Sequence, residues 1–336
     1  IGFDETLTKN DRDGLADACV EFLQREHTRP FMLTASFINP HDICYWAINE
    51  ESRVTGCEPR YTDEIATALV NEAATPPPGV EPSEFIERMC PPLPNNYEVP
   101  ENEPDSIAGK EGQIGFLRRH NTEEDWRVYR RIYAQLTESV DAQIGRVLDA
   151  LRRQGLEENT LVVFASDHGD MNGHHRLGLK SMFYEESARV PFIVSLPGVT
   201  ATGRVDTAHP VAAGLDLIPT LCDFAGVQTP AGLPGRSVRP LAEGKQAPDW
   251  RTEVGVENAT GGRMVRTARH KYCIYPTGER REQLMDLEED PGEMLNVVDL
   301  PKYQSIRADL RSRLLAWMER VEDPMQPKLL DGVPAH

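Results

Sequence analysis

The longest hydrophobic pattern in the chain runs from Thr122 to Gly155. Apolar side chains recur there every three or four residues, with charged side chains between them, which is the spacing of an amphipathic helix. Thr122 can cap the first turn, three acidic residues follow it, and Gly155 can end the last turn. The pattern therefore predicts one long helix. Its apolar face consists of Trp126, Tyr129, Tyr133, Leu136, Val140, Ile144, Val147 and Leu151.

Three shorter stretches with the same spacing predict further helices. Residues 13–23 carry apolar side chains at helical positions behind Asp13, which can cap the helix. Residues 215–225 form the second stretch, and Gly226 can end it. The third lies near the end of the chain, and its buried face is marked by Ile306, Leu310, Leu314 and Trp317.

Three apolar runs predict strands. The run at residues 31–38 is short and is followed by Asn, Pro and His. The runs at residues 160–166 and 190–196 are continuously apolar, which is typical of strands buried in a parallel sheet. Strands and helices alternate along this part of the chain, so the predicted fold class is α/β, with a sheet layered by helices.

Two regions interrupt this alternation. Residues 50–120 contain many prolines, which forbid long regular elements, and an irregular stretch of this length is usually a functional loop. From about residue 245 onward, short strand-like pieces separated by turns precede the final helix. We therefore expect a large α/β domain over residues 1–245 and a small α+β subdomain over residues 246–336. The strand-like pieces lie at residues 252–256, 263–267 and 271–275.

Composition limits the partners that this protein can have. The chain has 336 residues, with 36 Lys and Arg against 54 Asp and Glu, which gives a formal charge of −18. Nucleic acids require a basic surface on the protein, which a chain this acidic lacks. We therefore expect no nucleic-acid partner. No apolar run reaches the ~18–20 residues of a membrane span, so we expect no such span. The six Cys form no C-x-x-C pair, which excludes a zinc ribbon, and leave disulfides an open question.

Chemically capable side chains gather where two of the predicted strands end. His41 follows the first strand, and Asp167, His168 and Lys180 follow the strand at residues 160–166. Ligands of α/β folds bind at the carboxyl ends of strands, and an Asp-His pair suits a metal ion there. Taken singly, Asp167 is more often a turn residue, and His41 more often an ordinary surface or core histidine. The cluster as a whole is harder to explain by structure alone.

Several blocks of this sequence resemble the type I sulfatases, a family of the alkaline-phosphatase superfamily. The central block, residues 166–193, begins with Ser-Asp-His-Gly-Asp, contains Lys180 and is similar to the core motif of the family. Residues 29–41 resemble its P-F-F-L…P-H block, and residues 216–237 resemble its helix and G-R-S-L segment. The resemblance continues into the C-terminal region, as far as about residue 325, and is weakest over residues 50–120.

This resemblance implies a fold and a reaction. The fold is a large mixed sheet sandwiched by helices, followed by a small C-terminal sheet with one helix. The reaction is the hydrolysis of sulfate esters. In the family, a formylglycine made from Cys or Ser forms a hydrate that attacks the sulfur beside a divalent cation, which is usually Ca²⁺.

The resemblance also implies which residues bind the metal. By position, Asp167 and His168 would be metal ligands. Calcium prefers oxygen ligands, whereas imidazole suits Mn²⁺ or Zn²⁺ better, so the presence of a divalent cation is predicted more firmly than its identity.

The remaining site residues follow from the same resemblance. Lys180 would contact the sulfate and the leaving oxygen. His41 would be the general acid. His175 and Arg176 would bind substrate near the sulfate or the adjacent sugar. The chemistry agrees, because a sulfate ester oxygen leaves poorly unless it is protonated, which His can do near neutral pH. Negative charge that develops on the sulfuryl oxygens also needs fixed cations.

One part of the family's machinery has no counterpart in this sequence. No Cys stands in the motif C-x-P/A-x-R, since Cys57-Glu-Pro-Arg is one residue short, and the paired N-terminal Asp ligands are also missing. A truncated sequence, a separate N-terminal chain and a catalytically inactive protein would each explain this. We expect truncation, with the formylglycine in the missing N-terminal part, because His41 and Lys180 are both present.

The expected function is that of a sulfuric-ester hydrolase acting on a small-molecule or saccharide sulfate ester. A sugar sulfate is favoured, because His-His-Arg at residues 174–176 and the long stretch at residues 50–120 could border a wide, cationic pocket. Two alternatives remain open: a phosphonate or phosphate mono- or diester hydrolase of the same superfamily, and a noncatalytic remnant that binds sulfate. The resemblance also favours a periplasmic or secreted protein, and a homo-oligomer or a separate N-terminal chain is a further expectation.

Overall fold

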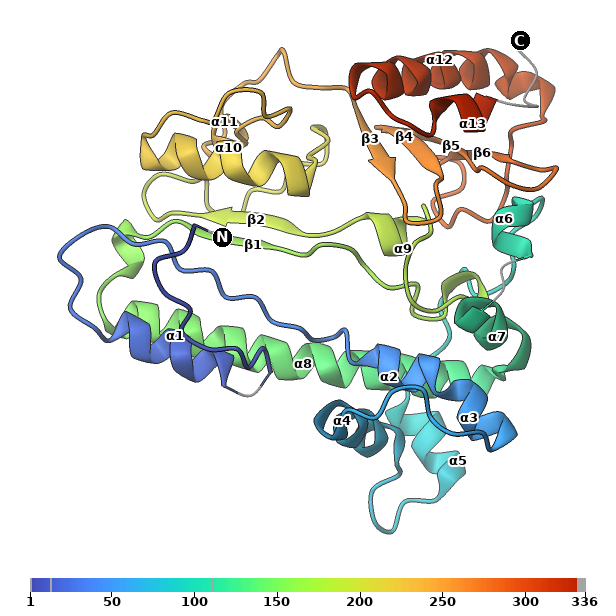
Figure 1. Cartoon of the computed structure of the whole chain (residues 1–336), viewed down its shortest axis with the longest axis horizontal. Coiled ribbons are helices and arrows are strands. Elements are labelled where there is room, and N and C mark those ends of the chain that lie inside the picture. Colours follow the sequence, from blue (N-terminus) through green and yellow to red (C-terminus); the bar gives the residue numbers. More distant parts are fainter. Residues whose placement is uncertain (1, 13, 110–111, 331–336) are drawn as a thin grey trace. The chain divides into compact units, whose positions relative to one another are not determined.

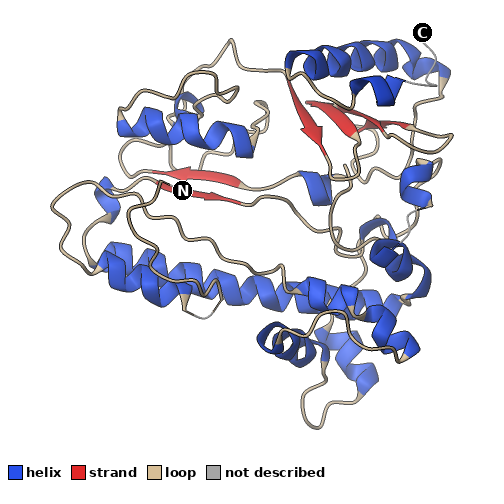
Figure 2. Ribbon diagram, in the orientation of Figure 1, coloured by secondary structure: helices blue, strands red, loops and turns tan. Residues whose placement is uncertain are grey.

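The computed structural model describes residues 2–12, 14–109 and 112–330. The chain divides into two compact units, and every strand of the described residues lies in the second one (Figure 2). The first unit is therefore built from helices and loops, and the second from helices and sheets. The first unit comprises Ile1–Leu93, His120–Leu161 and Leu196–Gly198, and the second comprises Pro94–Arg119, Val162–Ser195 and Val199–His336.

A 31-residue helix, α8 (Glu123–Arg153), organises the first unit (Figure 1). It is the long helix predicted from the sequence, and reciprocal hydrogen bonds between Thr122 and Asp125 close its first turn. The helix predicted for residues 13–23 is also confirmed, although Asp13 itself lies outside the described residues. The helices that pack against α8 are α1 (Leu15–Leu23), α2 (Ile43–Ile48) and α4 (Glu64–Ala74).

The proline-rich stretch over residues 50–120 is more helical than the sequence suggested. Its helices are short, as expected, because Pro lacks the amide hydrogen that a helix interior requires. The prediction of a wholly irregular loop is therefore wrong, whereas the exclusion of long elements is confirmed. Besides α4, the stretch contains α3 (Glu50–Thr55), α5 (Pro82–Glu84), the π-helical turn η1 (Phe85–Met89), α6 (Asp105–Ala108) and α7 (Gly112–His120).

The strand predicted for residues 31–38 is wrong, since these residues form no strand in the described part of the chain. A strand needs a neighbouring strand for its backbone hydrogen bonds as well as apolar side chains. At the end of this segment, the N–H of Ile38 instead donates to the carbonyl of Asp11 at 3.2 Å. Apolar composition alone did not reveal whether a partner strand would be present.

Both later strands are present, but they pair in the direction opposite to the one expected. β1 (Val162–Ala165) and β2 (Phe192–Ser195) run antiparallel, with Val163 opposite Val194. Phe164 and Ile193 are exposed, so the expectation of strands buried in a parallel sheet is wrong for the described residues. Apolar content indicates a tendency to be buried, whereas strand direction depends on the connection, which here folds back through α9 (Glu185–Ala188).

A four-stranded antiparallel sheet forms the C-terminal part of the second unit, in the order β3-β4-β5-β6. The first three strands confirm the strand-like pieces in the sequence. The fourth was missed, because the five-residue sequence Glu-Gln-Leu-Met-Asp is short and largely polar. The bounds are β3 (Glu253–Glu257), β4 (Arg263–Thr267), β5 (His270–Ile274) and β6 (Glu282–Asp286).

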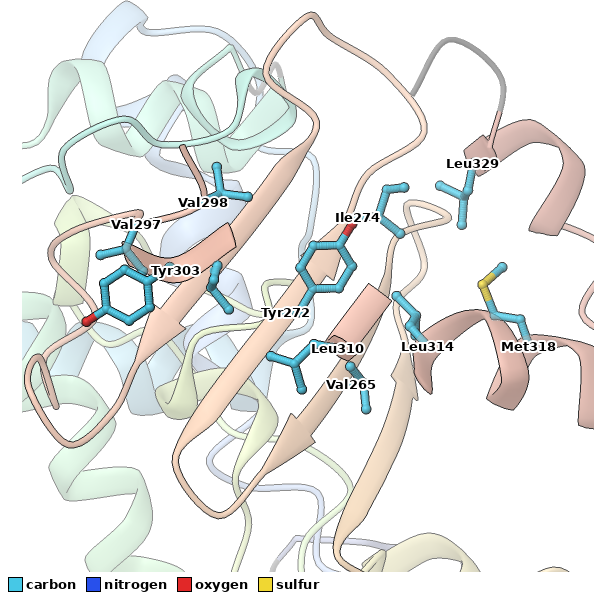
Figure 3. Close-up of a cluster of buried hydrophobic side chains, with 11 residues drawn as sticks. Val265, Tyr272, Ile274, Val297, Val298, Tyr303, Leu310, Leu314, Met318 and Leu329 are labelled. Carbon is cyan, nitrogen blue, oxygen red and sulfur yellow. The ribbon is translucent and has the colours of Figure 1, made fainter. Parts of the chain in front are cut away.

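The final predicted helix, α12 (Gln304–Arg320), packs against this sheet (Figure 1). Leu310, Leu314 and Met318 recur every four residues and are buried in one cluster with side chains of the sheet. Removing such a buried Leu side chain typically costs about 2–5 kcal/mol. Figure 3 shows the members of this cluster, which also include Val265, Tyr272, Ile274, Val297, Val298, Tyr303 and Leu329.

Helix α10 (Ala213–Ala225) is also confirmed, and Gly226 ends it in a left-handed conformation with φ 67°. Its buried side is polar. Asp216 has no exposed surface, pairs with the guanidinium of Arg251 and accepts the N–H of Arg236 at 2.8 Å. Hydrogen bonds and an ion pair therefore fix this helix, while its apolar residues Leu215 and Ile218 are exposed.

The α/β fold class is confirmed, whereas the domain boundary after residue 245 remains a prediction. In the described ranges, no helix has both the length and the apolar character that crossing a membrane requires. The structure describes all six Cys as free thiols. The remaining elements are η2 (Glu157–Asn159), η3 (His174–Arg176), α11 (Arg239–Ala242), η4 (Pro301–Tyr303) and α13 (Gln326–Leu330).

Candidate active site

The candidate site begins where β1 ends. Here the chain passes close to the backbone of α9, and the N–H of Gly169 donates to the carbonyl of Ser187 at 2.9 Å. A Cβ at position 169 would lie only 2.0 Å from the carbonyl oxygen of Glu186. Glycine is therefore required at this crossing, immediately after the predicted metal ligands.

Asp167 and His168 face each other through one oxygen and one nitrogen atom. Nδ1 of His168 lies 2.9 Å from the carbonyl oxygen of Gly169, so this nitrogen carries a hydrogen and donates it. The other ring nitrogen, Nε2, lies 3.3 Å from Oδ2 of Asp167. The carboxylate is 83% exposed. An imidazole oriented through a backbone carbonyl, next to an accessible carboxylate, fits a pair of metal ligands.

This pair would be only part of a complete coordination shell. Structural and catalytic metal sites in proteins use at least three protein ligands as a rule. Within residues 2–12, 14–109 and 112–330, no group of three or more His, Cys, Asp or Glu side chains could hold a metal ion. Among the described residues, this segment therefore offers one candidate oxygen ligand and one candidate nitrogen ligand.

The segment that follows, residues 172–181, is a tightly wound turn with left-handed backbone at five non-glycine positions. For residues with a side chain, this conformation costs on the order of 1 kcal/mol or more each, and it persists only where the surroundings enforce it. Strain of this kind collects at functional sites. The five residues are Asn172, His175, Arg176, Leu179 and Ser181.

Buried side chains beneath this turn enforce its conformation. Met171, Leu177 and Phe183 are almost completely buried and belong to one apolar cluster. The same cluster contains side chains from β4, β5 and β6, so the four-stranded sheet is the base on which the turn rests. Its other members are Ile107, Met182, Tyr184, Met264, Cys273, Tyr275 and Met285.

The carboxylate of Glu186 approaches two adjacent histidines of the turn. Oε1 lies 3.0 Å from Nδ1 of His174, and Oε2 lies 3.8 Å from Nε2 of His175. Burial opposes the ionisation of Glu186, but its interactions with the two histidines and with Asn96 outweigh burial and hold the pKa of the carboxyl far below its usual range. Glu186 is therefore an anion at neutral pH.

His175, a predicted substrate-binding residue, has no exposed surface. Its ring stacks on Tyr184 with centroids 4.1 Å apart. Its backbone N–H donates to the backbone carbonyl of Asn96 at 2.8 Å. Its own carbonyl accepts a hydrogen bond from Arg118 at 3.0 Å. The ring therefore lies beneath the surface of the turn, and direct contact with substrate stays a prediction.

The other two predicted residues of the turn are partly accessible. Arg176 is half-exposed, forms an ion pair with Glu98 at 2.9 Å and places its guanidinium 4.9 Å from the ring centroid of Tyr97. Lys180 is half-buried and stands between two left-handed residues, which fix the course of the backbone on both sides of it.

A buried lysine that the sequence reasoning missed ties this region to the C-terminal sheet. Nζ of Lys271 donates to the carbonyl of Phe183 at 2.7 Å and lies 2.6 Å from Glu293 and 2.9 Å from Glu185. Burial alone would lower the pKa of Lys271, but the two carboxylates outweigh it and raise that pKa. One signal for its burial was present in the sequence. Lys271 and Cys273 are two residues apart in β5, so their side chains lie on the same face of the strand.

His41 belongs to the first unit, where it is exposed on the turn before α2. The backbone N–H of His41 donates to the backbone carbonyl of Ile38 at 3.0 Å. The next residue, Asp42, is fully buried and accepts two hydrogen bonds from Arg12, at 2.7 and 2.8 Å. A bidentate ion pair therefore fixes the turn that carries His41.

The structure thus places five of the predicted site residues in one segment of the second unit, and His41 in the first unit. What the sequence reasoning missed is the supporting set around that segment. Four of these supporting residues come from far along the chain and have no motif of their own, whereas Glu186 lies within the central block at residues 166–193. They are Asn96, Arg118, Glu186, Lys271 and Glu293.

Family models identify the class of protein that this arrangement belongs to. A model described as Sulfatase matches residues 4–227, which is more than half of the chain. A second, described as "N-sulphoglucosamine sulphohydrolase, C-terminal", matches residues 173–320. The chain belongs to the sulfatase family.

Individual relatives agree with this assignment. The chain is 31% identical over 338 residues to a Delta 4,5-hexuronate-2-O-sulfatase of Bacteroides thetaiotaomicron, a match that covers 96% of this chain and 63% of the relative. It is 28% identical over 345 residues to an arylsulfatase of Clostridium perfringens, with 99% and 63% covered. The chain therefore spans less than two thirds of the length of these relatives.

Solved structures show the same fold. A 2-O GAG sulfatase superposes with a TM-score of 0.75 at 29% identity, and the match covers 97% of this chain and 67% of that one. A phosphonate monoester hydrolase of Agrobacterium radiobacter superposes with a TM-score of 0.64 at 23% identity, covering 91% and 60%. The second likeness is one of fold alone.

Proposed function

We propose that this protein is a sulfuric-ester hydrolase that removes sulfate from a carbohydrate. Membership of the sulfatase family supports the reaction, and the 31% identity to a hexuronate-2-O-sulfatase supports the saccharide. The observation that carries the proposal is the segment from Asp167 to Lys180. It lies within the matched family region, brings a candidate metal-ligand pair and two cationic side chains close together in sequence, and rests on the C-terminal sheet.

Within this reaction, Lys180 contacts the sulfate group and the leaving oxygen. A fixed positive charge stabilises the negative charge that grows on these oxygens as the S–O bond breaks. His41 acts as the general acid that protonates the leaving oxygen, a role that suits an imidazole near neutral pH. These roles rest on the family resemblance, and the firmly held turn around His41 supports its part.

Asp167 and His168 hold a divalent cation in this proposal, most simply Ca²⁺, with Mn²⁺ and Zn²⁺ as alternatives. Such a cation, when bound, supplies positive charge to the sulfate oxygens. The hydrogen bond from His168 to the carbonyl of Gly169 orients the ring so that Nε2 lies on the side of Asp167. The family's nucleophile is a formylglycine, and no residue of this chain is assigned to that role.

Arg176 and His175 form the substrate-binding part of the proposal. The guanidinium of Arg176 is partly exposed and can pair with an anionic oxygen of the saccharide once it releases Glu98. His175 contributes through the turn that it supports from below. A periplasmic or secreted location and an additional chain or copy as a partner are further proposals, drawn from the same resemblance.

The test begins with the sequence of the whole gene that encodes this chain, which defines the complete gene product. That product is then assayed for the hydrolysis of three substrates. Release of sulfate is measured from a 2-O-sulfated unsaturated uronide disaccharide and from an aryl sulfate, and hydrolysis of the ester bond is measured for a phosphonate monoester. We expect sulfate release from the disaccharide, and a loss of it in the Lys180→Ala variant. Faster turnover of the phosphonate would contradict the proposal in favour of a phosphonate hydrolase. Binding of the sulfated sugar without any turnover would favour a noncatalytic protein.

A further inference from the structure

The two histidines at positions 174 and 175 have opposite environments. The ring of His175 is fully buried on Tyr184, whereas His174 keeps 24% of its side chain exposed. The sequence predicted an individual substrate-binding role for His175, and placed His174 only within the His-His-Arg stretch of a cationic pocket. Accessibility points instead to His174 as the histidine of this turn that a ligand can reach.

The hydrogen bonds of Asn96 determine which nitrogen of His174 carries a hydrogen. The amide nitrogen of Asn96 donates to Oε1 of Glu186 at 2.9 Å and to the carbonyl of Gly292 at 3.1 Å, so both of its hydrogens point to acceptors. Its carbonyl oxygen therefore faces Nδ1 of His174. The other neighbour of that nitrogen, Oε1 of Glu186 at 3.0 Å, also only accepts. Two acceptors around one nitrogen require Nδ1 to be the donor.

The opposite edge of the ring is thereby left available. When the neutral ring carries its hydrogen on Nδ1, Nε2 presents a lone pair. Among the described residues, none makes a hydrogen bond to Nε2 of His174. An imidazole whose inner nitrogen is fixed by a carboxylate and whose outer nitrogen is accessible has the geometry of an oriented binding or proton-exchanging group.

We infer that His174 binds a hydroxyl group of the saccharide through Nε2, and that Glu186 and Asn96 are the positioning residues that fix its ring. A hydroxyl is favoured over an anionic oxygen, because the ionised Glu186 next to the ring repels a second negative charge. A hydroxyl can also donate to the neutral ring and accept from the protonated one. The inference rests on the proposed function, since it names a contact with the sugar of the proposed substrate.

The first test concerns the ring itself and needs no activity. Long-range ¹H–¹⁵N spectra of the imidazoles report which nitrogen is protonated, and the signal of His174 is assigned by its loss in the His174→Gln variant. We expect the Nδ1–H form for the parent protein and for a charge-matched control, Glu138→Gln on the exposed side of α8. Glu186→Gln removes one of the two acceptors of Nδ1, so it should raise the share of the Nε2–H form, while the carbonyl oxygen of Asn96 keeps the Nδ1–H form populated. A parent spectrum of the Nε2–H form would overturn the inference.

The second test uses the complete gene product and two substrates. His174→Gln should raise KM for the sulfated disaccharide about tenfold, the loss of one ordinary hydrogen bond, with little change in kcat. On an aryl sulfate, which has no sugar hydroxyl, the rise in KM should be several-fold smaller. Equal effects on both substrates, or none on the disaccharide, would overturn the contact. If the parent hydrolyses neither sulfate ester, the proposed function fails, while the protonation of His174 is still decided by the spectra.

Discussion

The side chain of Gly169 is a single hydrogen atom, and this small size lets the segment after β1 pass close to α9. Replacing Gly169 by Ala would place a methyl group 2.0 Å from the carbonyl oxygen of Glu186, and both the segment and the helix would have to shift. We expect Gly169→Ala to lower the free energy of unfolding by about 2 kcal/mol or more. Urea denaturation followed by circular dichroism measures this change.

The matched control for that substitution lies in α8. A Cβ at Gly145 meets no atom within 4 Å, and the residue is inside the helix, where Ala is favoured over Gly. Gly145→Ala should therefore stabilise the protein by about 0.5–1 kcal/mol. If both substitutions changed stability equally, the close approach at Gly169 would not be a real feature of the fold.

The proposed metal pair makes a second prediction at the scale of residues. A divalent cation that binds the folded state raises the melting temperature as its concentration increases. We expect Ca²⁺ or Mn²⁺ to raise the melting temperature, EDTA to reverse the effect, and Asp167→Ala to abolish it. Asp141→Ala, which removes an exposed carboxylate of α8, should retain the effect. Equal, tight binding of the metal by Asp167→Ala, measured by metal analysis, would refute the assignment.

At this scale, the sequence revealed the residues that stand in a motif and not those that support them. Asp167, His168 and Lys180 follow one another within a short, recognisable block. Glu186, later in the same block, and Asn96, 78 residues away from His174, both contact that ring. No pattern in the sequence indicates that such distant polar residues will meet, because the meeting depends on the tertiary fold.

Within the C-terminal elements, one buried carboxylate joins the end of β6 to the start of α12. Asp286 accepts two hydrogen bonds from Arg269, both at 2.8 Å, and one from the hydroxyl of Tyr303 at 2.9 Å. The hydrogen bonds from Arg269 contribute most, and together with that of Tyr303 they outweigh burial and hold the pKa of Asp286 well below its usual range. This carboxylate therefore favours the folded state when it is ionised.

The sign of the pH dependence follows from that direction. Because the pKa is lower in the folded state, the stabilisation is complete above the unfolded value of about 4 and is lost as the pH falls through the folded value. Asp286→Asn should lower the free energy of unfolding at pH 7 by about 2 kcal/mol and flatten its decline below pH 4. The control Asp309→Asn, an exposed partner of Arg313, should change little. An unchanged acid profile for Asp286→Asn would contradict this account.

At the scale of elements, the sequence predicted helices better than strand pairing. Helical spacing is a local property, so α1, α8, α10 and α12 could all be predicted from it. Pairing is not local, so the direction of β1 against β2, the absence of a strand at residues 31–38 and the presence of β6 all escaped prediction. The same limit explains why α10 turned out to bury its polar rather than its apolar side.

For the whole molecule, the proposed function assigns His41 and Lys180 to one hydrolytic reaction. His41 belongs to the first unit and Lys180 to the second. In the proposal, the first protonates the leaving oxygen and the second stabilises charge on the sulfate. These two roles respond differently to the acidity of the leaving group. An acidic leaving group needs little protonation, so the role of the acid becomes less important. Negative charge on the sulfate oxygens is present with either leaving group, so the stabilising cation remains important.

The most direct test measures kcat/KM of the complete gene product and two variants on sulfate esters with poor and good leaving groups. Lys180→Ala should lower kcat/KM by roughly 10²-fold or more on both kinds of ester. His41→Ala should cost ~10²–10⁴-fold on an alkyl or sugar sulfate and much less on an aryl sulfate with an acidic leaving group. Equal losses for His41→Ala on both kinds of ester would contradict its role as the general acid and reduce it to a binding residue.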